Sequence, residues 1–223
     1  MKTLVDDFKL YSKDKGISSS VFDSIIKNTE NSLTPVVLEE RKMNVVGMDI
    51  YSRLLYDRIL YFGEHFTAET CNLAIAQLLY LNSIEERDIN IYINSGGGSV
   101  VDGLGLIDTM NFIESGISTT CVGMAASMGA VLLSCGDKGK RFVLPHSRVM
   151  IHQVSSGMRG TVSDMKIEFE QAEKCKLDVY NILATNLNKT YEEIETLCDR
   201  DNWFIGDEAV KLGIADAVLM KKN

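Results

Sequence analysis

Hydrophobic residues recur with two different periods along this chain of 223 residues. Short β-branched segments predict strands, and longer segments with apolar residues three or four positions apart predict helices. The predicted strands cover residues 59–62, 88–93, 117–122, 149–152 and 215–219. The predicted helices cover residues 20–27, 50–56, 67–81, 101–113, 163–187 and 207–213, with shorter ones after Ser127 and Thr190. This alternation predicts an α/β fold with a largely parallel sheet and right-handed crossovers.

The N-terminal part stands apart from this alternation. Thr34 and Pro35 break the pattern, and residues 36–47 are expected to be extended or mobile. We therefore expect an N-terminal arm or propeptide-like segment at residues 1–34 and one domain at residues 35–223.

In the long helix, apolar residues form a stripe that is typical of a core or an interface rather than a cofactor site. Its members are Met165, Phe169, Ala172, Val179, Leu183 and Leu187.

Composition excludes several classes of partner. The net charge is −8 and no basic cluster occurs, which argues against nucleic acid and anionic membranes. No apolar run approaches the roughly 20 residues of a membrane span, and the N-terminus carries charges where a signal peptide would be apolar. The five cysteines lack metal-binding or redox spacing, so we expect buried thiols in a reducing compartment, the cytoplasm.

A turn of small residues, Gly-Met-Ala-Ala-Ser-Met-Gly-Ala at 123–130, carries the first candidate chemistry. It follows a predicted strand and precedes an apolar helix, which places Ser127 beside the free N–H groups of a helix terminus. Its small neighbours leave room for a substrate carbonyl, so Ser127 is a candidate nucleophile. The alternative is a serine that caps a buried helix.

Only three histidines, His65, His146 and His152, can act as a general base. His152 ends an apolar strand, where a histidine is either a catalyst or an ordinary core residue. Asp201 carries little signal by itself. Together with Ser127 and His152, however, it would complete a set of nucleophile, base and orienting acid.

A second loop, Ile-Tyr-Ile-Asn-Ser-Gly-Gly-Gly-Ser-Val at 91–100, ends a strand in three glycines. Such a loop can bring a backbone N–H close to a bound group, and the N–H of Met128 could supply a second oxyanion donor. Phosphate binding is a weak alternative, because neither Lys-Ser/Thr nor the dinucleotide-binding glycine spacing is present. A plain tight turn is the other alternative.

These motifs, with segments 49–55, 149–153 and 200–201, resemble the ClpP family, the proteolytic subunits of ATP-dependent Clp proteases. The resemblance covers roughly residues 35–221. It implies a ClpP/crotonase fold of repeated β-β-α units, with a protruding strand-helix handle at about 154–187. It also implies a serine endopeptidase that needs no metal or cofactor, with Ser127 as nucleophile, His152 as base and Asp201 as orienter. The resemblance assigns the oxyanion hole to the N–H groups of Gly98 and Met128.

The resemblance also implies how substrates and partners bind. Unfolded proteins would be delivered by a separate AAA+ unfoldase, since the sequence contains no Gly-x-x-x-x-Gly-Lys-Ser/Thr motif. The family assembles as two stacked heptameric rings, and Asp199 and Arg200 match its charge pairing across rings; the alternative is that both are ordinary solvated charges. Extended substrate would lie along Gly97, Ser99, Val100, Val154 and Ser155. The unfoldase-docking pocket between subunits would include Tyr92, Phe112 and Leu219, although each could equally be a core residue.

Two positions depart from the family pattern. Gly96 and Val154 stand where the family usually has proline, so no catalytic atom is lost but the cleft gains freedom. Three hypotheses follow. The first is an active subunit in general protein degradation and quality control. The second is a catalytically silent ring-forming scaffold, which the intact Ser127, His152 and Asp201 oppose. The third is a crotonase-like acyl-CoA enzyme, which those three residues also oppose.

Overall fold

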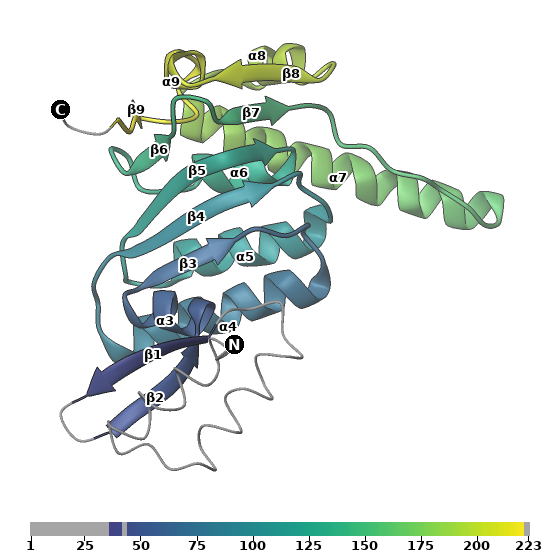
Figure 1. Ribbon diagram of the computed structural model, residues 1–223. Helices are drawn as coiled ribbons and strands as arrows, with labels where there is room; N and C mark the ends of the chain where they lie inside the picture. The colour runs from purple at the N-terminus through teal and green to yellow at the C-terminus, as the bar shows by residue number, and fades with distance from the viewer. Residues whose placement is uncertain (1–35, 42–43, 221–223) are drawn as a thin grey trace, which may run out of the picture. The chain divides into compact units, whose positions relative to one another are not determined.

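The computed structural model describes residues 36–41 and 44–220, with side chains from residue 48 onward (Figure 1). The helix expected at 20–27 and the arm expected at 1–34 lie outside the described residues. Contacts divide the chain into two compact units, Met1–Asp57 and Arg58–Asn223, and each is described by itself. The domain boundary expected near residue 34 remains a prediction.

In the first unit, a hairpin precedes a short helix. Strands β1 (Val36–Arg41) and β2 (Asn44–Asp49) pair antiparallel over the segment that was expected to be extended. Helix α3 (Ile50–Tyr56) follows directly, with the predicted bounds. The carboxylate of Asp49 accepts the N–H groups of Tyr51 and Ser52, which explains why the helix begins here.

The second unit is built on a seven-stranded sheet (Figure 1). Its strands are β3 (Ile59–Phe62), β4 (Ile89–Ser95), β5 (Ile117–Ala126), β6 (Arg141–Val143), β7 (Arg148–Ile151), β8 (Asn202–Ile205) and β9 (Ala217–Val218). The order is β3-β4-β5-β6-β9, with β7 paired to β5 and to β8. All these pairs are parallel except β7 with β8, which confirms the expected α/β fold with a largely parallel sheet.

The sheet branches at β5. Residues 119–121 of β5 pair with β6, whereas residues 124–126 pair with β7, so one long strand supports two neighbours. The predicted strand at 117–122 is therefore too short, because β5 continues through the small residues up to Ala126. Strands β6 and β8 were not predicted: β6 has only three residues, and β8 follows polar residues that favour a loop.

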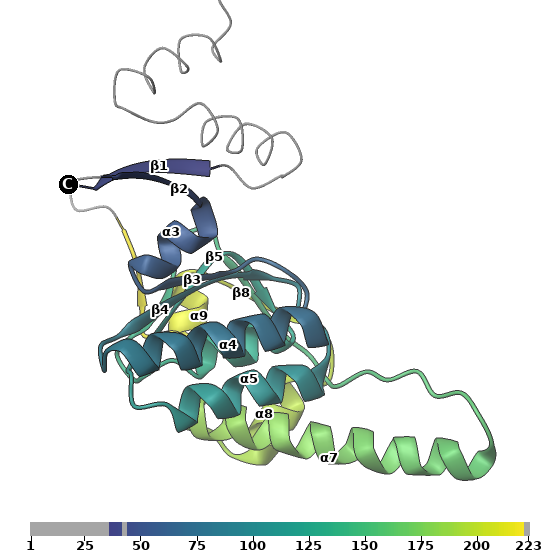
Figure 2. The same cartoon turned by 90° about the horizontal axis from the view of Figure 1, so that it is seen from below.

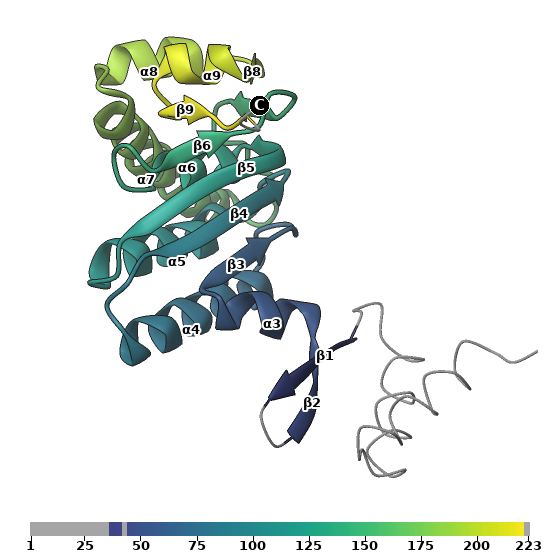
Figure 3. The ribbon, with the colours of Figure 1, turned by 60° about the vertical axis from the view of Figure 1, so that its left-hand side comes forward.

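Helices cover the sheet, and several begin and end where the sequence predicts. They are α4 (Ala68–Ile84), α5 (Val100–Phe112), α6 (Met128–Ser134), α7 (Val162–Leu187), α8 (Tyr191–Leu197) and α9 (Asp207–Leu212). Figures 2 and 3 show α4 and α5 side by side along one face of the sheet. Thr67 and Thr190 form capping boxes, and Gly213 ends α9 in the left-handed conformation. No helix within the described ranges is long and apolar enough to cross a membrane.

Helix α7 has two different halves. Near its C-terminal end Val179, Leu183 and Leu187 are buried, whereas Phe169 in the other half is half exposed and that half extends away from the sheet (Figure 2). This agrees with the helical part of the expected handle. The strand part is absent from the described chain, because residues 152–161 have no strand to pair with and remain extended coil.

The five cysteines are free thiols. Cys71, Cys121 and Cys198 are buried as expected, whereas Cys135 and Cys175 are half-buried. Burial raises the pKa of both Cys135 and Cys198 to about 11, so these thiols stay protonated.

Candidate active site

Ser127 lies at the junction of β5 and α6, in a backbone conformation that L-residues rarely adopt. Its φ is 55° and its ψ is −124°, a strain of about 1–3 kcal/mol. The surrounding structure holds this conformation, because the N–H of Ser127 donates to the carbonyl of Met150 on β7 at 2.9 Å. The Ser127 side chain makes no capping hydrogen bond to α6. The hydroxyl is therefore not used as a helix cap, the alternative that the sequence left open.

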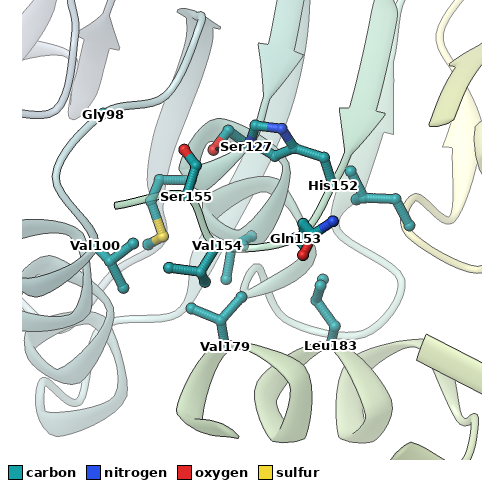
Figure 4. A pocket seen from close by; sticks show the side chains of 12 residues that line it. Gly98, Val100, Ser127, His152, Gln153, Val154, Ser155, Val179 and Leu183 are labelled. Carbon is teal, nitrogen blue, oxygen red and sulfur yellow. Dashed lines mark hydrogen bonds between the residues drawn. The ribbon is translucent and has the colours of Figure 1, made fainter. Parts of the chain in front are cut away.

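The hydroxyl of Ser127 instead faces His152 (Figure 4). The Nε2 atom of His152 is 2.9 Å from Ser127 Oγ, and its Nδ1 atom is 3.2 Å from Asp201 Oδ1. A carboxylate only accepts, so Nδ1 carries the hydrogen and the lone pair of Nε2 faces the hydroxyl. This is the tautomer that a general base requires.

Strand pairing explains why the histidine and the aspartate meet. In the antiparallel pair β7–β8, Ile151 lies opposite Asn202. His152 follows one strand and Asp201 precedes the other, so the same register brings them together. The Asp201 side chain is 63% exposed, which makes it the most solvated member of the group.

The glycine loop packs directly against the nucleophile. Gly97 and Gly98 have φ values of +91° and +149°, which require glycine. A Cβ on Gly97 would lie 2.6 Å from the Cβ of Ser127, and a Cβ on Gly98 would lie 2.4 Å from the carbonyl oxygen of Phe66. The backbone of the loop can therefore approach the site only because it carries no side chains.

The two predicted oxyanion donors are the backbone N–H groups of Gly98 and Met128. Phe66 donates to the carbonyl of Gly97 at 3.0 Å and accepts from the N–H of Ser99 at 2.9 Å. The peptide between Gly97 and Gly98 is trans, so the N–H of Gly98 points away from Phe66; Gly98 and Ser127 both line one pocket. Met128 is the first residue of α6, where an N–H has no intrahelical partner.

A pocket lined by both apolar and polar residues opens beside Ser127 (Figure 4). Its apolar lining residues are Val100, Met128, Val131, Ile151, Val154, Val179 and Leu183. Gly98, Ser127, His152, Gln153 and Ser155 complete the lining. Of the predicted substrate-binding residues, Val100, Val154 and Ser155 line the pocket, whereas Gly97 and Ser99 belong to the adjoining loop.

Five of the lining residues were not predicted as part of the site: Val131, Ile151, Gln153, Val179 and Leu183. Val179 and Leu183 lie one helical turn apart on α7, and their apolar spacing was interpreted only as core or interface. Gln153 donates from Nε2 to the carbonyl of Asp199 at 2.9 Å, linking the segment after His152 to the loop before Asp201. Its position directly after His152 was the only signal in the sequence.

The predicted inter-ring residues are exposed in this chain. The side chains of Arg200 and Asp199 are 89% and 76% exposed, and Arg200 Nε lies 4.0 Å from Asp199 Oδ2. Contacts of this kind contribute little within one subunit.

The three residues expected in the docking pocket lie on different elements. Tyr92 is half-buried on β4, Phe112 is 81% exposed at the end of α5, and Leu219 is 40% exposed after β9. A shallow hollow contains Phe112 together with Leu79 and Thr109, but neither Tyr92 nor Leu219. Within one chain, the structure does not bring the three together.

Comparisons with known proteins agree with the fold and the site. Residues 41–222 match the family model described as Clp protease. The ATP-dependent Clp protease proteolytic subunits of Bacteroides fragilis (strain YCH46) and Bacteroides thetaiotaomicron are each 47% identical over 220 residues, covering 98% of this chain and 100% of the relative. The corresponding subunit of Porphyromonas gingivalis is 43% identical over 221 residues, with the same coverage.

The fold, together with these matches, defines a serine peptidase. The chain belongs to the Clp protease family. This confirms the family and the enzyme class that the sequence motifs predict. The comparisons support neither the silent scaffold nor the acyl-CoA enzyme.

Proposed function

We propose that this chain is the proteolytic subunit of an ATP-dependent Clp protease and hydrolyses peptide bonds of unfolded proteins with Ser127 as nucleophile. The observation that carries the proposal is the hydrogen-bonded series from Ser127 Oγ to His152 and on to Asp201. The names of the relatives, each an ATP-dependent Clp protease proteolytic subunit, support the same function.

In the proposed reaction, His152 Nε2 takes the hydroxyl proton while Ser127 Oγ attacks the substrate carbonyl. The carbonyl oxygen becomes negatively charged and accepts hydrogen bonds from the N–H groups of Gly98 and Met128. The imidazolium then gives its proton to the leaving amine, and an acyl-enzyme ester remains. Water attacks this ester with His152 as base again, which releases the acid and restores Ser127.

Substrate would bind as an added strand. Phe66 occupies one edge of the segment around Gly98, so the opposite edge is open to an extended peptide. Val154 and Ser155 line the pocket from the other side and would complete the binding cleft. Backbone pairing gives affinity that depends little on side chains, as degradation of many proteins requires.

The assembly and the partner follow from the same proposal. Two stacked heptameric rings would bury the exposed apolar residues of α7, among them Val162, Ile167 and Phe169. Pairing between rings would engage Asp199 and Arg200, and the coil at 152–161 would gain a strand partner. A cytoplasmic AAA+ unfoldase would dock at pockets between neighbouring subunits that include Tyr92, Phe112 and Leu219, and residues 1–34 would form an N-terminal arm.

Covalent labelling tests the assignment of the nucleophile. A fluorophosphonate probe should modify Ser127, as mapped by mass spectrometry of the adducted peptide, and the Ser127→Ala variant should remain unlabelled. Protein that has been denatured with acid before the probe is added is the matched control. It should not be labelled, because the reaction depends on His152 being in place. An adduct on a different serine would contradict the proposal.

A further inference from the structure

His65 has no part in the proposed reaction, yet its ring contacts the glycine loop. It lies between β3 and α4, and its Nδ1 atom is 3.2 Å from the carbonyl oxygen of Gly97. A carbonyl only accepts, so in this contact Nδ1 carries the hydrogen and donates. The same oxygen accepts the N–H of Phe66 at 3.0 Å. Two donors from adjacent residues therefore bind one carbonyl group.

This carbonyl belongs to the same peptide group as the N–H of Gly98. The peptide is planar and trans, so its C=O and N–H point in opposite directions. Donors that hold the Gly97 oxygen also direct the Gly98 N–H toward the pocket beside Ser127. The two glycines offer little steric resistance to rotation of the peptide between them. A rotated peptide would present an oxygen, not an N–H, to a developing oxyanion.

The backbone around His65 is well anchored. Thr70 Oγ1 donates to the carbonyl of His65 at 2.7 Å, and Ser95 Oγ donates to the carbonyl of Glu64 at 2.6 Å. Phe66 is buried and packs on Phe62 with ring centroids 4.6 Å apart. The imidazole therefore extends from a fixed position rather than from a free loop.

Position 96 leaves room for this ring. A Cβ on Gly96 would lie 3.4 Å from Cε1 of His65, so the imidazole occupies the space next to this glycine. The two positions are thus in direct proximity, and the histidine lies where the loop lacks the stiffness of a proline.

We propose that His65 is a positioning residue for the oxyanion hole. Its Nδ1–H donates to the Gly97 carbonyl. This hydrogen bond directs the N–H of Gly98 toward the substrate oxygen and polarises that N–H group. This inference rests on the proposed function. It predicts that the contribution of His65 appears in the transition state, when the oxyanion forms, and not in substrate binding.

Three variants of His65 in the full-length chain separate the donor from the shape of the side chain. His65→Asn keeps a nitrogen donor near the position of Nδ1. His65→Asp has the shape of asparagine without the donor, and His65→Ala removes both the donor and the planar side chain. Steady-state kcat and KM on a fluorogenic peptide are measured per assembled particle, as quantified by analytical ultracentrifugation. A peptide aldehyde, whose hemiacetal oxygen occupies the oxyanion position, provides a second measurement.

We expect kcat to fall about 2- to 10-fold in His65→Ala and His65→Asp with KM nearly unchanged, since a single hydrogen bond is lost. His65→Asn should retain kcat within about twofold. Inhibition by the aldehyde should weaken in parallel with kcat. Wild-type kcat in all three variants, an equal loss in His65→Asn and His65→Ala, or a loss confined to KM would overturn the inference.

Ser127→Ala, assayed in parallel, separates this inference from the proposed function. Turnover by Ser127→Ala near the parent rate would contradict the proposed function, whatever the His65 variants do. An inactive Ser127→Ala beside a fully active His65→Ala would contradict only the role of His65.

Discussion

Gly97 lies so close to Ser127 that no side chain fits between them. A Cβ on Gly97 would be 2.6 Å from the Cβ of Ser127 and 2.8 Å from the carbonyl oxygen of Ala126. Real Cβ atoms do not approach other atoms this closely, so either the loop or the nucleophile would have to move. The geometry of the site therefore depends on the absence of a single methyl group.

Adjacent alanine substitutions test this dependence. Gly97→Ala should lower kcat by about 100-fold or more, because the methyl group displaces the loop that carries a predicted oxyanion donor. Gly96→Ala is the comparison, since its Cβ would make only ordinary van der Waals contacts, with His65 Cε1 at 3.4 Å, Met124 Cε at 3.6 Å and His65 Nδ1 at 3.9 Å. Peptide hydrolysis by both variants checks the prediction. Equal activities would show that the contact at Gly97 is unimportant.

Substitutions of the three hydrogen-bonded residues should differ in severity. Ser127→Ala and His152→Ala should be about equally inactive, because residues that act as a unit do not contribute additively. Asp201→Asn should retain more activity than either, since Asp201 is largely exposed and its bond to His152 is 3.2 Å long. The kcat values of the three variants decide the point. Asp201→Asn as inactive as Ser127→Ala would contradict it.

The sequence predicted the order of helices and strands well because most of them have strong periodicity or explicit caps. Thr190 and Glu193 form the predicted capping box, and α3 has the predicted bounds. Strand β8 was missed because its position depends on pairing with β7, and no local pattern records that pairing. Tertiary contacts decided this element, not propensity.

The candidate site could likewise be predicted only where the local sequence pattern determines it. Ser127 and His152 each follow a strand directly, so their places were visible from local pattern. Val179 and Leu183 line the pocket, but their sequence pattern cannot distinguish a pocket wall from a core. The sequence also left the role of the Ser127 hydroxyl open. Its contact with His152, and the absence of a capping hydrogen bond from its side chain to α6, show that it is not a helix cap.

Arg200 provides a test of the proposed double ring. We expect Arg200→Ala to give single rings or a misaligned active site, with loss of peptidase activity although Ser127 is untouched. The reason is that Arg200 adjoins Asp201 and is 89% exposed, available to a carboxylate of another subunit. Arg87→Ala, another exposed arginine with an acidic neighbour, is the control. Ultracentrifugation and a peptide assay check both variants, and a fully active double ring of Arg200→Ala would refute the coupling.

The ion pair between Asp216 and Arg141 should make the free energy of unfolding depend on pH. Burial by itself would raise the pKa of Asp216, but hydrogen bonds from the Arg141 side chain and from the N–H groups of Arg141 and Gly139 outweigh it and lower this pKa. A carboxyl with a lowered pKa stabilises the folded state above its ordinary pKa near 4, and this stability is lost as the pH falls through the lower folded value.

Asp216→Asn is the corresponding variant. At neutral pH it should cost about 3 kcal/mol, because the nearly buried guanidinium of Arg141 loses its charged partner. Thermal unfolding across pH should show the difference in Tm between wild type and variant narrowing below about pH 4. A difference that stays constant into that range would show that the pair is not responsible.

Cleavage preference should follow from the pocket beside Ser127. The walls formed by Val100, Val154, Val179 and Leu183 are apolar, so an apolar side chain before the cleaved bond gains burial there. A charged side chain would lose its solvation without an opposite charge in the lining, where His152 is already engaged by Asp201. A peptide library should therefore show weak selectivity with an apolar preference at this position. Val179→Asp, on the pocket wall, should reduce that preference, whereas strict selection for a charged residue by the wild type would contradict the assignment of the pocket.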